Sequence, residues 1–104
     1  MGSEGAWYVY LLRCGDASLY AGVTTDPVRR LALHEAGRGA RYTRGRGPFE
    51  WVGQAGPVSR GEALRWEARL KRTPRYRKVT ALRELAQACG NEHAATPSAP
   101  RKTL

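Results

Sequence analysis

The stretch Trp7-Tyr8-Val9-Tyr10-Leu11-Leu12 decides the fold, because every residue in it is aromatic, β-branched or aliphatic. Such a run predicts a strand that is apolar on both faces and therefore central in its sheet. Gly15-Asp16 is a turn signal, and residues 19–23, Leu-Tyr-Ala-Gly-Val, predict a second strand. The two strands predict a hairpin in which Tyr10 lies within about one position of Tyr20.

A helix, a loop and a third strand are predicted next. Asp26 followed by Pro27 is a helix start, and this helix is expected to extend to about Glu35. Residues 37–48 contain four Gly and four Arg, which predicts an irregular loop. Residues 49–54, Phe-Glu-Trp-Val-Gly-Gln, predict the third strand.

Two more helices are predicted after that strand. Ser59 and Glu62 have the spacing of a capping box, which starts a helix that is expected to reach Lys71. Thr73-Pro74 starts another helix, and Gly90 is its expected terminator. The predicted order of elements is therefore β-β-α-β-α-α.

The length of 104 residues and the 41% of hydrophobic residues predict one small domain. We expect this domain over residues 6–89, and a disordered tail over residues 90–104, which are rich in Ala, Thr and Pro. No apolar run is long enough to span a bilayer, and the N-terminus does not resemble a secretory signal. Two cysteines are too few for a disulfide scaffold, so a cytoplasmic location is expected.

Positive charge is concentrated in two stretches of the chain. The formal net charge is +9, and 15 of the 18 basic residues are Arg. Residues 29–46 carry six Arg and one acid, a local charge of +5, and residues 60–83 carry nine basic residues and two acids, a local charge of +7. Such clusters favour a nucleic acid as the partner over a membrane surface.

Glu67 breaks the apolar pattern of the helix that follows Ser59. Ala63, Trp66, Glu67 and Leu70 stand at positions i, i+3, i+4 and i+7, so the carboxylate lies in the apolar stripe. Burying an unpaired carboxylate is costly, and Glu67 must therefore meet a cation, a metal ion or a hydrogen-bond donor. It is either one partner of a structural ion pair with an Arg or a metal-binding or catalytic group.

Arg30 and His34 lie on one face of the first predicted helix because they are four residues apart. One interpretation is a solvated face with an incidental histidine. The other is a pair directed at a phosphate, with His34 available for proton exchange.

Tyr10 and Tyr20 are core aromatics by default, but beside a basic cluster and a metal-bound water they would lose or relay a proton at lower pH than a free phenol.

These residues, in this order, resemble the GIY-YIG nuclease superfamily. Tyr8-Val9-Tyr10 stands where the family has Gly-Ile-Tyr, and Tyr20-Ala21-Gly22 stands where it has Tyr-Ile-Gly. Arg30 corresponds to the family's catalytic Arg, His34 to its helix His, and Glu67 to its metal-binding Glu. The chain looks most like the small, single-domain bacterial proteins of the YhbQ type. It is also similar to the nuclease domain of the Slx-type structure-specific endonucleases.

The resemblance implies an α/β (α+β) fold with a small central three-stranded antiparallel sheet flanked by helices. It also implies phosphodiester hydrolysis with one divalent cation, Mg²⁺ or Mn²⁺, held by Glu67. Arg30 would stabilise negative charge on the phosphorus centre, and Tyr10 or Tyr20, aided by His34, would take a proton from water. The side chains expected to contact the nucleic-acid backbone are those of Arg29, Arg38, Arg41, Arg44, Arg46 and Lys71. For Lys71, one turn beyond Glu67, the alternative is a simple Glu–Lys pair on the helix.

Two functions from different classes fit the sequence. The first is a metal-dependent endonuclease that hydrolyses DNA. Its expected substrate is branched or damaged DNA in repair or recombination, and it would act within a larger repair complex or alone. The second is a non-catalytic nucleic-acid-binding module with a vestigial nuclease site, because the basic stretches give affinity without any chemistry.

Overall fold

The computed structural model describes residues 6–89. The predicted tail, residues 90–104, and the expected terminator Gly90 lie outside the described residues. The elements follow the predicted order β-β-α-β-α-α, so the predicted fold class is confirmed. They are the strands β1 (Trp7–Arg13), β2 (Leu19–Thr24) and β3 (Glu50–Val58), the helices α1 (Pro27–Glu35), α2 (Arg60–Arg72) and α3 (Arg75–Ala88), and the short 3₁₀ helix η1 (Arg41–Thr43).

The three strands form an antiparallel sheet in the order β2-β1-β3. The central place of β1, which its two apolar faces predict, is therefore confirmed. Residues Val9 to Leu12 of this strand are fully buried. Because successive side chains of a strand point to opposite faces, Val9 and Leu11 pack on one side of the sheet and Tyr10 and Leu12 on the other.

The predicted hairpin is confirmed, but Tyr10 and Tyr20 lie one position farther apart than predicted. Tyr10 pairs with Gly22 and Leu12 pairs with Tyr20, so the two tyrosines are two positions apart. A two-residue turn at Gly15-Asp16 would have placed them one position apart and on opposite faces. The loop instead has a third residue, Ala17, with a φ of 72°, as in three-residue hairpin loops. The even offset places both tyrosines on the same face.

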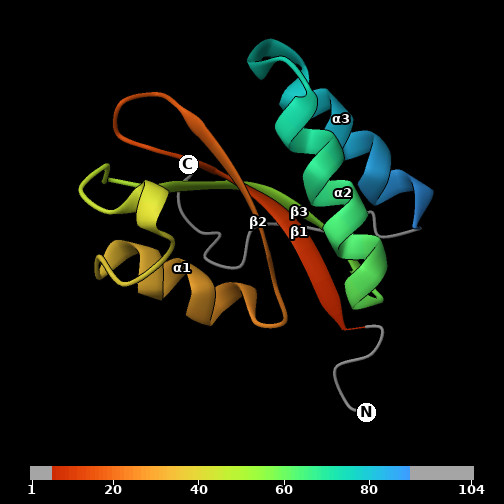
Figure 1. Ribbon diagram of the computed structural model, residues 1–104, viewed down its shortest axis with the longest axis horizontal. Coiled ribbons are helices and arrows are strands. Elements are labelled where there is room, and N and C mark those ends of the chain that lie inside the picture. The colour runs from red at the N-terminus through yellow and green to blue at the C-terminus, as the bar shows by residue number, and fades with distance from the viewer. Residues whose placement is uncertain (1–5, 90–104) are drawn as a thin grey trace, which may run out of the picture.

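The molecule has three layers (Figure 1). Helices α2 and α3 cover one face of the sheet, where Leu70, Leu82 and Leu85 join the larger core cluster. Helix α1 and the loop that contains η1 lie on the opposite side of the sheet from α2 and α3 (Figure 1). There Leu31 and Trp51 pack with the α1-facing residues of β1. No helix within residues 6–89 has both the length and the apolarity that crossing a membrane requires.

Local capping rules place the helix starts correctly. The carboxylate of Asp26 accepts a hydrogen bond from the Arg29 amide, with Pro at the first position of α1. The Ser59 hydroxyl accepts from the Glu62 amide at the start of α2. The third strand extends four residues beyond its predicted end, through Pro57, because β3 is an edge strand and an edge tolerates a residue without an amide hydrogen.

Candidate active site

The hydroxyl group of Tyr10 is the meeting point of two α1 side chains. Its oxygen lies 2.8 Å from Nε2 of His34, and Nε of Arg30 donates to it over 3.3 Å. The Tyr10 side chain is 0% exposed and its ring stacks on Trp51, with centroids 4.4 Å apart and an interplanar angle of 20°. The helix spacing of four residues, which placed Arg30 and His34 on one face, therefore directs both side chains at one buried phenol.

His34 is buried, which excludes the interpretation of an incidental histidine on a solvated face. Its side chain is 1% exposed, and Nδ1 lies 2.9 Å from the hydroxyl oxygen of Thr43. Thr43, also 1% exposed, donates its own proton to the Ala40 carbonyl over 2.9 Å. The backbone at Gly39 passes so close that a Cβ atom there would collide with Nδ1 of His34. The glycine-rich loop thus closes over the imidazole.

Burial sets the protonation of both groups. Burial and the nearby Arg30 charge lower the pKa of His34 to about 4, so the imidazole is neutral at pH 7. Burial raises the pKa of Tyr10 to about 12, and the Arg30 hydrogen bond and charge offset only part of this rise. Without a metal ion the Tyr10 phenol is therefore neutral at physiological pH. Its loss or relay of a proton beside a metal-bound water stays a prediction.

Tyr20 completes an aromatic cluster around the imidazole. Its ring centroid lies 5.7 Å from that of His34 and 6.3 Å from that of Tyr10. Its other neighbour is Tyr42, whose ring stacks on it at 5.8 Å and is 44% exposed. Tyr42 and Thr43 both lie in the loop that the sequence predicted only as irregular. No periodicity marks such positions, so the sequence reasoning missed both residues.

Glu67 lies on α2, which packs against β1 and β2 on the side of the sheet opposite α1 (Figure 1). Its side chain is 19% exposed and pairs with Nζ of Lys71 at 3.4 Å, so its partner is a lysine one turn away and not one of the arginines. Its negative charge is close enough to contribute to the raised pKa of Tyr10. Glu67 therefore lies within electrostatic reach of the Tyr10 hydroxyl.

The chemistry of the donors near Tyr10 fits a hard divalent cation with few protein ligands. Among residues 6–89 no group of three or more His, Cys, Asp or Glu side chains gathers at one point. Mg²⁺ is commonly held by only one or two carboxylates, with water and substrate phosphates completing its shell. A single half-buried carboxylate at Glu67 is compatible with that mode of binding, and the Lys71 ammonium would have to move aside.

The basic loop residues fall into two groups. Arg38, Arg41 and Arg44 are exposed. Arg46, by contrast, is tied into the fold: Nη1 lies 2.6 Å from Oδ2 of Asp16, Nε donates to the Tyr42 carbonyl, and the guanidinium lies 4.3 Å from the Tyr42 ring centroid.

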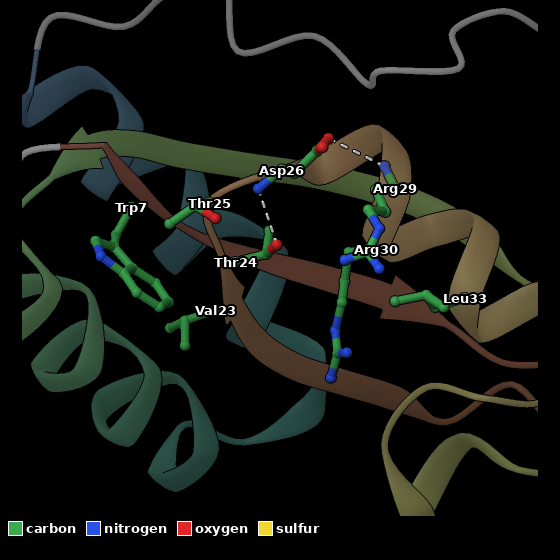
Figure 2. A pocket seen from close by; sticks show the side chains of 8 residues that line it. All are labelled: Trp7, Val23, Thr24, Thr25, Asp26, Arg29, Arg30 and Leu33. Carbon is green, nitrogen blue, oxygen red and sulfur yellow. Dashed lines mark hydrogen bonds between the residues drawn. The ribbon is translucent and has the colours of Figure 1, made fainter. Parts of the chain in front are cut away.

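A pocket of about 310 Å³ lies beside Arg30, between the start of α1 and the end of β2. Figure 2 shows the Arg30 side chain extending along one side of it, with Trp7 and Val23 on the opposite side. The exposed Arg29 also lines this pocket, and its backbone amide is held by the Asp26 carboxylate. The pocket therefore joins an aromatic wall to two guanidinium groups.

Comparison with known proteins identifies the family of the chain. Residues 6–79 match the model of the GIY-YIG catalytic domain family. A UPF0213 protein of Nitratidesulfovibrio vulgaris is 54% identical over 80 residues, 77% of this chain and 73% of that protein. A UPF0213 protein of Cupriavidus pinatubonensis is 45% identical over 87 residues, 84% of this chain and 97% of that protein.

Among solved structures, the chain is similar to the solution NMR structure of a UPF0213 protein from Bacillus halodurans. The two are 43% identical, the match covers 85% of this chain and 89% of that one, and the TM-score is 0.45. The three-stranded sheet flanked by helices, together with the family match over residues 6–79, defines a small domain of the GIY-YIG catalytic type. The chain belongs to the GIY-YIG family. Membership implies a nucleic-acid substrate and a divalent metal ion, whereas the names of these relatives specify no activity.

Proposed function

We propose that this protein is a metal-dependent endonuclease that hydrolyses DNA phosphodiester bonds. The observation that carries the proposal is the buried Tyr10 hydroxyl, held by Arg30 on one side and by His34 on the other. The guanidinium of Arg30 and the neutral imidazole of His34 stabilise the fold no more than apolar side chains in their places would. They are the groups needed to hold a phosphate and to move a proton.

Each residue of the site has a role that follows from its surroundings. In this proposal Tyr10 passes a proton from the attacking water to His34. It is the proton-transfer group of the two tyrosines because, among the described residues, the hydrogen bond to His34 comes from Tyr10. Arg30 stabilises the negative charge that develops on the phosphate. Tyr20 packs against the imidazole and positions substrate or water. When bound by Glu67, Mg²⁺ or Mn²⁺ would stabilise the leaving oxygen.

The surroundings of the site support backbone recognition of the nucleic acid. The exposed loop residues Arg38, Arg41 and Arg44 are available for phosphates, and the pocket beside Arg29 has room for part of the substrate strand. Lys71, beside Glu67, is a further phosphate contact in this proposal. Contacts of this kind position a duplex without reading its bases. The proposal therefore favours branched or damaged DNA, recognised by its shape, over a defined sequence.

The test compares wild-type protein with Arg30→Ala and Glu67→Gln on branched DNA, linear DNA and RNA, with Mg²⁺, with Mn²⁺ and with EDTA. An exposed arginine of α3, substituted as Arg83→Ala, is the matched control. We expect metal-dependent cleavage of DNA by wild type and control, its loss in Arg30→Ala, and its loss in Glu67→Gln at the metal concentration that suffices for the wild type. Binding without cleavage under every condition would refute the enzyme and favour the non-catalytic binding module.

A further inference from the structure

Thr43 lies behind His34, on the side of the imidazole away from Tyr10, and none of the roles described above uses it. Its hydroxyl is within hydrogen-bond distance of Nδ1, while the Tyr10 hydroxyl is within the same reach of Nε2. We propose that Thr43 is a positioning residue: it keeps the proton of the neutral imidazole on Nδ1, so that the bare Nε2 receives the proton of Tyr10. The catalytic consequence rests on the proposed function.

The proton count in the hydrogen-bond chain gives the direction of each bond. The Thr43 hydroxyl has one proton, and it is donated to the Ala40 carbonyl. The Thr43 oxygen can then only accept from its other neighbour, Nδ1 of His34. A neutral imidazole carries a single N–H, so Nε2 is unprotonated and accepts from the Tyr10 hydroxyl.

The Tyr10 oxygen is consistent with this assignment, because it accepts from Nε of Arg30 while it donates to His34. With the proton on Nε2, the phenol oxygen would face two donors, Arg30 and His34. Thr43 would then have to turn its one proton to Nδ1 and give up its hydroxyl hydrogen bond to the Ala40 carbonyl, which would keep only the bond from the Thr43 amide. The Tyr10 proton would lose Nε2 as its acceptor, although in the protein without substrate the Tyr10 side chain is 0% exposed.

This arrangement makes Tyr10 a relay and not a pre-formed tyrosinate. As the oxygen of a water molecule forms its bond to phosphorus, one water proton passes to the Tyr10 oxygen and the Tyr10 proton passes to Nε2 of His34, giving an imidazolium. The electron pair of the broken P–O bond leaves with the departing sugar oxygen, which takes a proton from solvent. The imidazolium afterwards returns its proton through Tyr10 to solvent.

Long-range ¹⁵N–¹H NMR of labelled wild-type protein at pH 7 tests the assignment directly and needs no cleavage. The His34 signals are identified by their loss in His34→Gln. We expect a protonated Nδ1 and an unprotonated Nε2. A protonated Nε2 in the wild type would overturn the proposal, and this measurement requires no variant of Thr43 to fold.

The role of the hydroxyl is tested by Thr43→Val, which keeps the shape, and Thr43→Ser, which keeps the hydroxyl; Thr80→Val, at an exposed position of α3, is the control. We expect Thr43→Val to lose the single tautomer and to slow single-turnover cleavage about 100-fold, the scale of one proton-transfer catalyst. Thr43→Ser should restore both. A wild-type tautomer and rate in Thr43→Val would overturn the proposal. The correct tautomer in a wild-type protein that cleaves nothing would instead leave the positioning intact and sink the proposed function.

Discussion

The Tyr10 side chain lies where a side chain on residue 22 would be, and glycine at this position leaves room for it. The two residues pair directly across β1 and β2, and the Tyr10 ring lies over the glycine. A Cβ atom built on Gly22 would stand 2.5 Å from the Tyr10 hydroxyl oxygen and 2.7 Å from the ring carbon that bears it. The substitution Gly22→Ala therefore pushes directly on the atom that joins Arg30 and His34.

The size of the effect follows from these distances. Ordinary contact begins at 3.4 Å, so the hydroxyl must retreat by about 0.9 Å, the difference between 3.4 and 2.5 Å. A misplacement of about 1 Å at a catalytic centre costs roughly 100-fold in rate. We expect Gly22→Ala to lower the single-turnover cleavage rate by about that factor, while the affinity for DNA, which the arginines supply, stays close to that of the wild type.

The assay is single-turnover cleavage of a branched duplex with saturating metal ion, with circular dichroism and thermal unfolding to verify the fold. Gly61→Ala is the matched control, because a Cβ atom at Gly61 meets nothing closer than 3.8 Å. A folded Gly22→Ala that cleaves at the wild-type rate would refute the reasoning, since the position of the Tyr10 hydroxyl would then be irrelevant to the reaction.

Three further predictions concern titration, the loop and the metal ion. Because the pKa of His34 falls from 6.5 to about 4 on folding, the unfolded chain binds more protons, so the free energy of unfolding should decline as the pH falls from about 6.5 to about 4; urea titrations should show a flatter decline in His34→Gln. Arg41→Ala should lower the salt dependence of DNA binding, measured by fluorescence titration, by about one counterion. Arg46→Ala, whose guanidinium already pairs with Asp16, should leave that salt dependence unchanged and instead lower the Tm by a few degrees. A larger loss of salt dependence in Arg46→Ala than in Arg41→Ala would contradict this assignment. EDTA should abolish cleavage, and Glu67→Gln should raise the metal concentration for half-maximal rate at least about 10-fold; an unchanged metal titration would exclude Glu67 as the ligand.

The parts of the fold that follow local rules could be predicted from the sequence. The apolar run of β1, the Asp26 and Ser59 caps and the four-residue spacing of Arg30 and His34 each depend on neighbours in the chain, and the structure agrees with all of them. The spacing of Tyr10 and Tyr20 across the hairpin was not predicted, because the loop contains one extra residue, Ala17, which carries no turn signal of its own.

The surroundings of the site could not be predicted, because they depend on contacts between distant segments. His34 is buried between the aromatic side chains of Tyr10 and Tyr20 and the loop up to Thr43, which folds back over α1. The same burial acts against Arg30 on the Tyr10 pKa: the Arg30 hydrogen bond and charge lower this pKa, but burial raises it by more, to about 12. A motif names the residues of the site, whereas their protonation follows from packing.

The most direct test of the nuclease site is the single-turnover rate of Tyr10→Phe. Phenylalanine keeps the ring that stacks on Trp51 and removes only the hydroxyl that joins Arg30 to His34. The proposed site predicts a folded protein that still binds DNA and cleaves it at least about 100-fold more slowly than the wild type. Cleavage at the wild-type rate by Tyr10→Phe would contradict it.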